Sequence, residues 1–201
     1  MKRSSNTQTK AVKFESIRSP NGYHAFLVAT VELEDPGKGR LVRLKFSDGT
    51  VFQGLVASDV LRLGNLNGTW RATLHFTSNP NGNLKPPLRV QRLRPQASQI
   101  ETPATFWSIA GDIEHLDPVS ARVSLRTLTS RQNPTFFVNT IQLSKEQFET
   151  VQANPLSTWL MQGLLEQGLL AAQSISTVTI RIPRKSSLNT NPQGVSNHHE
   201  S

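Results

Sequence analysis

The sequence predicts a mainly β protein of two small barrel-like domains, of which the second has the longer helix. Three observations favour this fold. Apolar and polar residues alternate with the strand period of two over much of the chain, clusters of turn residues separate these runs, and the charge balance changes near residue 100. A chain of 201 residues is long enough for two such modules, since domains commonly have about 100 to 150 residues.

The first domain is expected over residues 11–95 and opens with strands. The run 24–34, HAFLVATVELE, has an apolar residue at every second position, as a long half-buried strand does. Residues 41–46 and 50–57 alternate in the same way on either side of Ser47-Asp48-Gly49, a sequence typical of a tight turn. These two runs are therefore expected to form a hairpin.

A short helix and two more strands complete this domain. Residues 58–64 combine an N-cap with a closing glycine, so they are expected to form a connector helix. Strands are expected over 69–76 and 88–94, and the broken alternation of the last one indicates a bulge or an edge position. Three strands, a short helix and two strands are the element order of the OB-fold, a five-stranded, partly open barrel.

The second domain is expected over residues 104–183 and has a similar order. Its strands are predicted over 105–115, 119–128, 135–143 and 177–183. Ser144 and Gln147 fit a capping box, so a helix is expected over 145–172, with an interruption by a proline. Its longer segment, 156–172, carries leucines and a tryptophan at helical spacing, which favours a helix over a strand.

Polar segments without hydrophobic periodicity lie outside the two domains. Residues 1–10 and 184–201 are expected to be disordered tails, and residues 96–103 a linker. Residues 11–18 form a spare strand in this interpretation. It can complete one of the two sheets, because the second domain otherwise lacks a fifth strand.

Composition and motifs exclude several functional classes. The absence of cysteine rules out disulfides, thiolate metal sites and cysteine nucleophiles, and the five histidines show no metal-ligand spacing, so no metal or cofactor is expected. Asp112 and Glu114 share a strand face, but a solvated face explains them better than a catalytic pair. No nucleotide-binding or nucleophile motif occurs, so the chain is expected not to be an enzyme.

Neither a membrane span nor a signal peptide is expected from the sequence. No apolar run approaches the length of about 18 residues that a bilayer span requires. The first residues, Met1-Lys2-Arg3-Ser4, lead into polar sequence instead of an apolar stretch. A soluble, cytoplasmic protein without a membrane role is therefore expected.

Basic residues are concentrated in the first half of the chain. Residues 1–100 hold 15 Lys and Arg against 6 Asp and Glu, a balance of +9, whereas residues 101–201 hold 7 against 8, a balance of −1. Arginine outnumbers lysine by 14 to 8, and guanidinium groups bind phosphate oxygens through two parallel hydrogen bonds. The pattern predicts a non-enzymatic protein that binds single-stranded RNA or DNA through a basic strand face of the first domain.

Basic side chains at outward positions of the predicted strands are the candidates for this face. They project from the side of each strand opposite to its apolar residues. Tyr23 adds an aromatic ring on which a base can stack, and Phe26 and Phe52 are further candidate platforms. The candidate binding residues are Arg43, Lys45, Arg71, His75, Arg89, Arg92, Arg94 and Tyr23.

A protein–protein adaptor or assembly module without a nucleic-acid role is the alternative. The predicted helix over 156–172 is apolar over a wide arc, with Leu165 on its flank. A homodimer or another protein partner can use such a surface, although packing across the end of the barrel explains it equally well. The charge pattern also fits a basic protein that its net charge keeps soluble.

Overall fold

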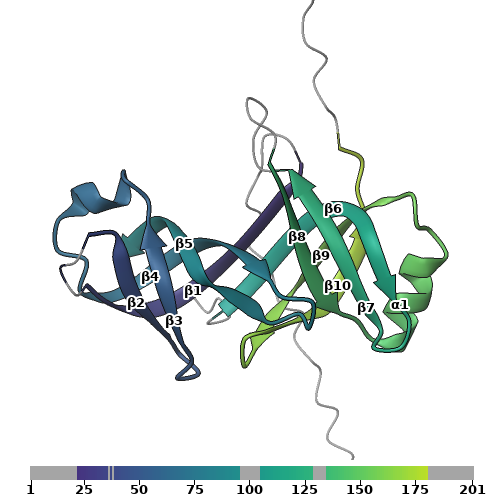
Figure 1. Ribbon diagram of the computed structural model, residues 1–201, viewed down its shortest axis with the longest axis horizontal. Helices are drawn as coiled ribbons and strands as arrows, with labels where there is room; N and C mark the ends of the chain where they lie inside the picture. Colours follow the sequence, from purple (N-terminus) through teal and green to yellow (C-terminus); the bar gives the residue numbers. More distant parts are fainter. Residues whose placement is uncertain (1–21, 36, 38, 96–104, 129–134, 181–201) are drawn as a thin grey trace, which may run out of the picture.

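The computed structural model describes residues 22–35, 37, 39–95, 105–128 and 135–180. These residues form mostly β-sheet, as Figure 1 shows. They contain ten strands, one 3-10 helix (η1) and one α-helix (α1). The elements are β1 (His24–Glu34), β2 (Leu41–Phe46), β3 (Val51–Val56), η1 (Val60–Leu63), β4 (Gly68–Ser78), β5 (Leu84–Pro95), β6 (Thr105–Asp117), β7 (Arg122–Leu128), β8 (Phe136–Gln142), α1 (Lys145–Gln152), β9 (Thr158–Glu166) and β10 (Leu169–Thr177). The predicted tails, linker and spare strand, at 1–10, 184–201, 96–103 and 11–18, lie outside the described residues.

Strands β1 to β5 form a closed five-stranded barrel, named here the first barrel. β1 pairs with β2, β2 with β3, β3 with β5, β5 with β4, and β4 with β1. Of these pairings, the one between β3 and β5 is parallel and the others are antiparallel. The hairpin predicted around residues 47–49 is confirmed, because Gly49 donates its N–H to the carbonyl of Phe46 between β2 and β3.

Strands β6 to β10, named here the second ring, pair in the corresponding order. β6 pairs with β7, β7 with β8, β8 with β10, β10 with β9, and β9 with β6. The β8–β10 pairing is again parallel and consists of one pair, Gln142 with Ala171. α1 lies between the third and fourth strands of this ring, where η1 lies in the first barrel.

One antiparallel ladder joins the two rings. Residues 24–29 of β1 pair with residues 105–110 of β6, and the later part of β1 pairs with β2 along the same edge. β4 occupies the other edge of β1. Residues 26–29 and 106–111 are buried without interruption, because both faces of the sheet are covered at this junction.

A second contact joins the rings at the tip of the β4–β5 hairpin. Leu84 donates its N–H to the carbonyl of Gly168 at 2.9 Å, and Leu170 donates to the carbonyl of Gly82 at 3.0 Å. The Ser78 hydroxyl also accepts a hydrogen bond from the N–H of Thr140 on β8. The hairpin therefore bridges from the first barrel to the second ring.

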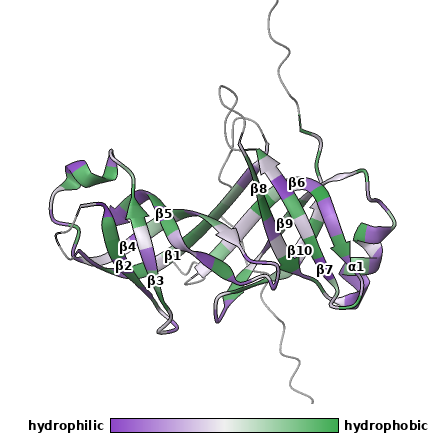
Figure 2. Cartoon of the chain, viewed as in Figure 1, coloured by the Kyte–Doolittle hydropathy of each residue, from purple (hydrophilic) through white to green (hydrophobic). Residues whose placement is uncertain are grey.

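Apolar side chains fill the interior of both rings. The largest fully buried side chains come from the first barrel and the second ring alike, and they include Leu27, Leu74, Trp107 and Ile141. Figure 2 shows the result as alternating hydrophobic and hydrophilic bands along the strands. The alternation that predicted the strands therefore corresponds to inward and outward faces.

The helix predicted over 145–172 is correct only at its start. Ser144 and Gln147 form the predicted capping box, and α1 begins there. The helix ends at Gln152, and the hairpin of β9 and β10 occupies the rest of the region. β10 is the fifth strand of the second ring, so the strand predicted over 177–183 is also misplaced within the described residues.

Packing between β9 and β10 explains why this region is not helical. Trp159, Met161 and Gly163 are buried at every second position of β9, as in a strand with one inward face. Leucines also occupy the other face, so this alternation is not visible in the sequence. At Gly163 a Cβ atom would lie 2.1 Å from the carbonyl oxygen of Ala171, so the close approach of the two strands requires glycine. Gln167 and Gly168 both have positive φ, as in the tightest hairpin turns.

A bulge in β5 explains the broken alternation of this strand. The register shifts between the pairs Thr73–Arg92 and Leu74–Val90, so Gln91 is an extra residue. The apolar residues on both sides of the bulge are therefore buried, and the arginines on both sides face outward. The predicted bulge is confirmed, whereas the edge position is wrong because β5 pairs with both β3 and β4.

Asn139 is a buried polar residue inside the second ring. It lies on β8 opposite Leu125 of β7 and is 0% exposed. Neither its Oδ1 nor its Nδ2 atom has a hydrogen-bond partner among the described residues. A buried polar group without a partner destabilises a protein by about 1–3 kcal/mol.

Gly163→Ala distinguishes the strand from the predicted helix. In a helix this change stabilises by about 1 kcal/mol, whereas on β9 the new methyl group meets the Ala171 carbonyl and the Trp107 ring. We expect the melting temperature to fall in a thermal melt followed by circular dichroism. Gln173→Ala, at an exposed position of β10, is the control and should change it little. A higher melting temperature for Gly163→Ala would contradict the strand.

Asn139→Leu is expected to stabilise the protein. Leucine has the same branching as asparagine, so the change removes an unpaired donor and acceptor while keeping the shape of the side chain. The free energy of unfolding, measured by urea denaturation, should rise by about 1 kcal/mol. Asn139→Asp should lower it, because a charge then enters an apolar interior. A less stable leucine variant would show that the amide has a partner.

Candidate functional site

A groove of about 790 Å³ lies between the first barrel and the second ring. Residues of β1, β4 and β5 line one side of it, and residues at the end of β7 and the start of β8 line the other. Aromatic rings and basic groups share this space. The groove residues with these groups are Tyr23, His24, Phe26, His75, Phe76, Arg89 and Phe137.

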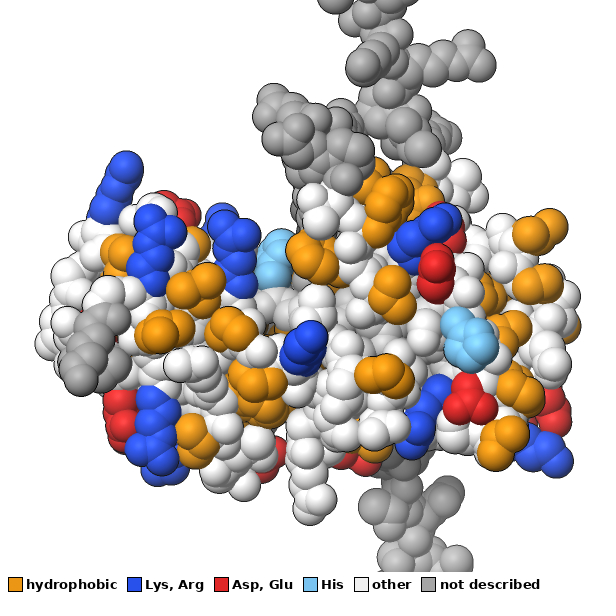
Figure 3. Space-filling view, viewed as in Figure 1, with side chains coloured by type: hydrophobic (Ala, Val, Ile, Leu, Met, Phe, Trp, Pro, Cys, Tyr) orange, Lys and Arg blue, Asp and Glu red, His pale blue; other side chains and the backbone are white. Residues whose placement is uncertain are grey.

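The predicted basic residues of β4 and β5 lie side by side. The antiparallel register puts Arg71 opposite Arg94 and His75 opposite Arg89, and Arg92 lies between these two pairs. We name Arg71, Arg89, Arg92 and Arg94 the arginine stripe. Figure 3 shows separate Lys and Arg side chains over both the first barrel and the second ring. The stripe leads into the groove at Arg89.

The three arginines of β5 are exposed and form no ion pair with the other described residues. Among the described residues, none of the ion pairs includes Arg89, Arg92 or Arg94. Arg71 is half-buried, and its guanidinium carbon lies 5.8 Å from the centre of the Phe106 ring. The stripe therefore presents guanidinium charge that no carboxylate of the described chain neutralises at β5.

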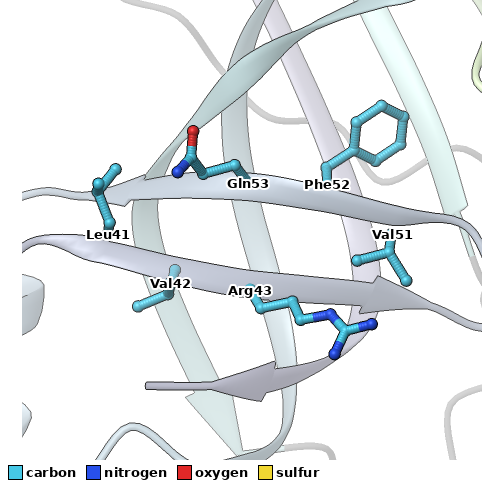
Figure 4. A pocket seen from close by; sticks show the side chains of 6 residues that line it. All are labelled: Leu41, Val42, Arg43, Val51, Phe52 and Gln53. Atoms are coloured by element: carbon cyan, nitrogen blue, oxygen red, sulfur yellow. The ribbon is translucent and has the colours of Figure 1, made fainter. Parts of the chain in front are cut away.

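Arg43 and Lys45 lie apart from the arginine stripe. Both are on β2, where Arg43 pairs with Glu34 at 3.3 Å and Lys45 pairs with Glu32 at 3.1 Å. Figure 4 shows Arg43 beside a shallow pocket on the β2–β3 hairpin. β1, which carries both glutamates, separates β2 from β4. The structure thus does not bring these two residues together with the other candidates.

Tyr23 lines the groove and is held there by a carboxylate. Its hydroxyl donates to Oδ2 of Asp112 at 2.8 Å, and the Thr158 hydroxyl donates to Oδ1 at 2.6 Å. Burial, and then the hydrogen bond to Asp112, raise the pKa of Tyr23. Glu114 pairs with Arg126 at 3.5 Å. Both carboxylates of the Asp112–Glu114 face therefore take part in contacts that hold the structure together.

His24 and His75 are the histidines that line the groove. His24 donates from Nδ1 to the carbonyl of Gly22 at 3.0 Å, so its neutral Nε2 accepts from the Ser108 hydroxyl at 2.8 Å. Burial lowers the pKa of His24. Burial, and then the charge of Arg89, lower the pKa of His75, whose side chain remains partly open to solvent. Both rings are neutral near pH 7 and become cationic only in acid.

The exposed aromatic rings of the groove region differ from those expected. Phe26 is only 5% exposed and stacks on His24, and Phe52 is half-buried against other core residues. Phe136 and Phe137 are 57% and 38% exposed at the start of β8. Sequence reasoning did not single them out. The available signal was two consecutive aromatic residues in a strand, since one of the two must face outward.

Comparison with known families identifies no relative, and the described residues hold no cluster of metal ligands. Among the described residues, no group of three or more His, Asp and Glu side chains can hold a metal ion. No helix in this part of the chain is long and apolar enough to cross a membrane. The chain matches no protein-family model and no curated protein. The function is therefore inferred from the geometry of the groove and the arginine stripe.

The lowered pKa of His24 predicts a loss of stability in acid. The unfolded chain binds the proton more tightly than the folded protein, so stability falls as the pH drops below the ordinary histidine value of 6.5. His24→Gln should reduce the difference in melting temperature between about pH 7.5 and about pH 5.5. His115→Gln, an exposed change on β6, serves as the control. An unchanged difference in the His24 variant would contradict the burial effect.

Proposed function

We propose that the protein binds single-stranded nucleic acid along the arginine stripe and into the groove, without catalysing a reaction. The observation that carries this proposal is the row of exposed arginines on β5 that have no ion pair among the described residues and lead into a groove with aromatic rings. Guanidinium groups bind phosphate oxygens bidentately, and aromatic rings stack on bases. A single strand of nucleic acid offers phosphate oxygens to the arginines and unstacked bases to the aromatic rings.

We infer that the first barrel and the second ring are two OB-like domains in tandem. The pairing order of both rings and their parallel third and fifth strands support this inference. OB-fold barrels that bind oligonucleotides can have unrelated amino-acid sequences. The absence of a sequence match is therefore compatible with the proposed function. The helix between the third and fourth strands is short in both rings.

The adaptor alternative is weakened because the helix on which it depended is absent from the described residues. Leu165, proposed as the exposed flank of that helix, lies on β9 and packs against the buried core cluster. The basic charge of the first half also includes Arg43 and Lys45, which are already paired with glutamates. Among the described basic residues of the first half that are in no ion pair, Arg89, Arg92 and Arg94 lie together on β5. A polyanion is therefore favoured over a protein partner.

Removal of the β5 charges is expected to weaken binding. We compare Arg92→Gln/Arg94→Gln with Arg43→Gln/Lys45→Gln, which changes the net charge equally but removes residues that are paired with β1. Fluorescence anisotropy of a labelled single strand of about 20 nucleotides, at about 50 mM and about 200 mM salt, gives the affinity and its salt dependence. The β5 variant should bind more weakly, and its log–log salt slope should fall by about 0.7 for each phosphate that it no longer neutralises.

Two outcomes would contradict the proposed function. No binding of the wild-type protein at about 50 mM salt would remove the nucleic-acid role altogether. Equal reductions in affinity in the two double variants would show that net charge, and not the arginine stripe, determines the affinity. Thermal melts of both variants show whether they are folded.

A further inference from the structure

The start of β8 exposes three successive apolar side chains. Phe136, Phe137 and Val138 are 57%, 38% and 41% exposed, whereas the next three residues of the strand are buried. β10 pairs with β8 only at Gln142, so among the described residues the start of β8 is paired on one side, with β7. Neighbouring exposed apolar groups on a strand edge favour aggregation, and their presence often marks a binding surface.

The two phenylalanine rings lie on opposite faces of this strand edge. Successive side chains of a strand point to opposite sides. Phe137 lines the groove. Phe136 lies on the other face, where the Arg126 guanidinium carbon is 5.1 Å from its ring centre, and Arg126 is held by Glu114 at 3.5 Å. The edge of β8 thus offers an aromatic ring on each side, and one of them lies beside a planar cation.

We propose that Phe136 and Phe137 stack on unpaired bases of the same strand whose phosphates bind the arginine stripe. The inference rests on the proposed function and specifies its ligand as a single strand that contacts both rings of the protein. Phe137 and Arg89 line the same groove, so a strand with its phosphates on β5 can turn its bases toward β8. Bases within a duplex are stacked on one another and cannot stack on these rings, so the two rings at the start of β8 select single strands.

An abasic oligonucleotide separates stacking from phosphate binding. The probes are oligothymidine of about 20 nucleotides and an abasic strand with the same number of phosphates, each titrated into the full-length protein; oligouridine serves as the RNA counterpart. The wild-type protein should bind oligothymidine more tightly than the abasic strand. Phe136→Ala/Phe137→Ala should lose about tenfold in oligothymidine affinity for each stacked base and little affinity for the abasic strand. Arg92→Gln/Arg94→Gln should weaken both.

Matched variants control for folding and for apolar area. Leu41→Ala/Val51→Ala removes two similarly exposed apolar side chains from the β2–β3 hairpin and should bind like the wild type. Phe136→Leu/Phe137→Leu keeps the apolar bulk without the rings, so it tests stacking even if the alanine variant does not fold. This variant should also lose the preference for oligothymidine.

The outcomes separate this inference from the proposed function. A wild-type protein that binds neither strand at low salt overturns both. Wild-type binding of the two strands with equal affinity, or an unchanged preference in the phenylalanine variants, overturns stacking at β8 while the phosphate-binding role of the stripe stands. Loss of the preference in both phenylalanine variants, with normal affinity in the Leu41/Val51 control, supports stacking on DNA, and the same loss with oligouridine extends it to RNA.

Discussion

The antiparallel ladder between β1 and β6 is the interaction on which the rest of the structure depends. β1 is a strand of the first barrel and β6 is a strand of the second ring. Residues 24–29 of β1 form backbone hydrogen bonds with residues 105–110 of β6, and this pairing joins the two rings. Burial of both sheet faces there requires continuous apolar runs in both strands. A break in this ladder would expose two strand edges and the apolar cluster of Phe26, Val28 and Phe106.

The same junction creates the groove. Because β1 and β6 are paired, the outward faces of β4 and β5 stand opposite the ends of β7 and β8, and the β4–β5 hairpin reaches across to the turn at Gly168. The bulge at Gln91 then decides which side chains reach this face, since it turns the arginines of β5 outward on both sides. Neither ring alone would provide both the arginines and the exposed phenylalanines.

Most strands of the first barrel could be predicted because the strand period of two dominates each of them. β1 and the β2–β3 hairpin follow the alternation and turn residues of the sequence closely. The region 156–172 could not, because its leucines fit helical and strand spacing alike and the choice depends on the contact between Gly163 and Ala171. Long-range packing of this kind leaves no local signal in the chain.

The sequence predicted the part of the candidate site that depends on single strands, and missed the part that depends on contacts between strands. Outward positions on β4 follow from alternation, so Arg71 and His75 could be grouped from sequence alone. On β5, Arg89 shares a face with Arg92 and Arg94 because of the bulge at Gln91, which the broken alternation indicated. Sequence cannot show that Arg43 and Lys45 face the glutamates of β1, or that Phe137 of the second ring faces the same groove as Arg89, because both facts depend on strand pairing across the fold.

The central claim is that one strand of nucleic acid contacts β4 and β5 of the first barrel and β8 of the second ring at the same time. Backbone amide chemical shifts of the isotope-labelled protein, recorded with and without an oligothymidine of about 20 nucleotides, test it most directly. We expect shift changes that cluster at residues 71–75, 89–94 and 136–138 in a single titration, with residues 41–56 little affected. Changes confined to residues 41–56, or to one ring alone, would contradict it.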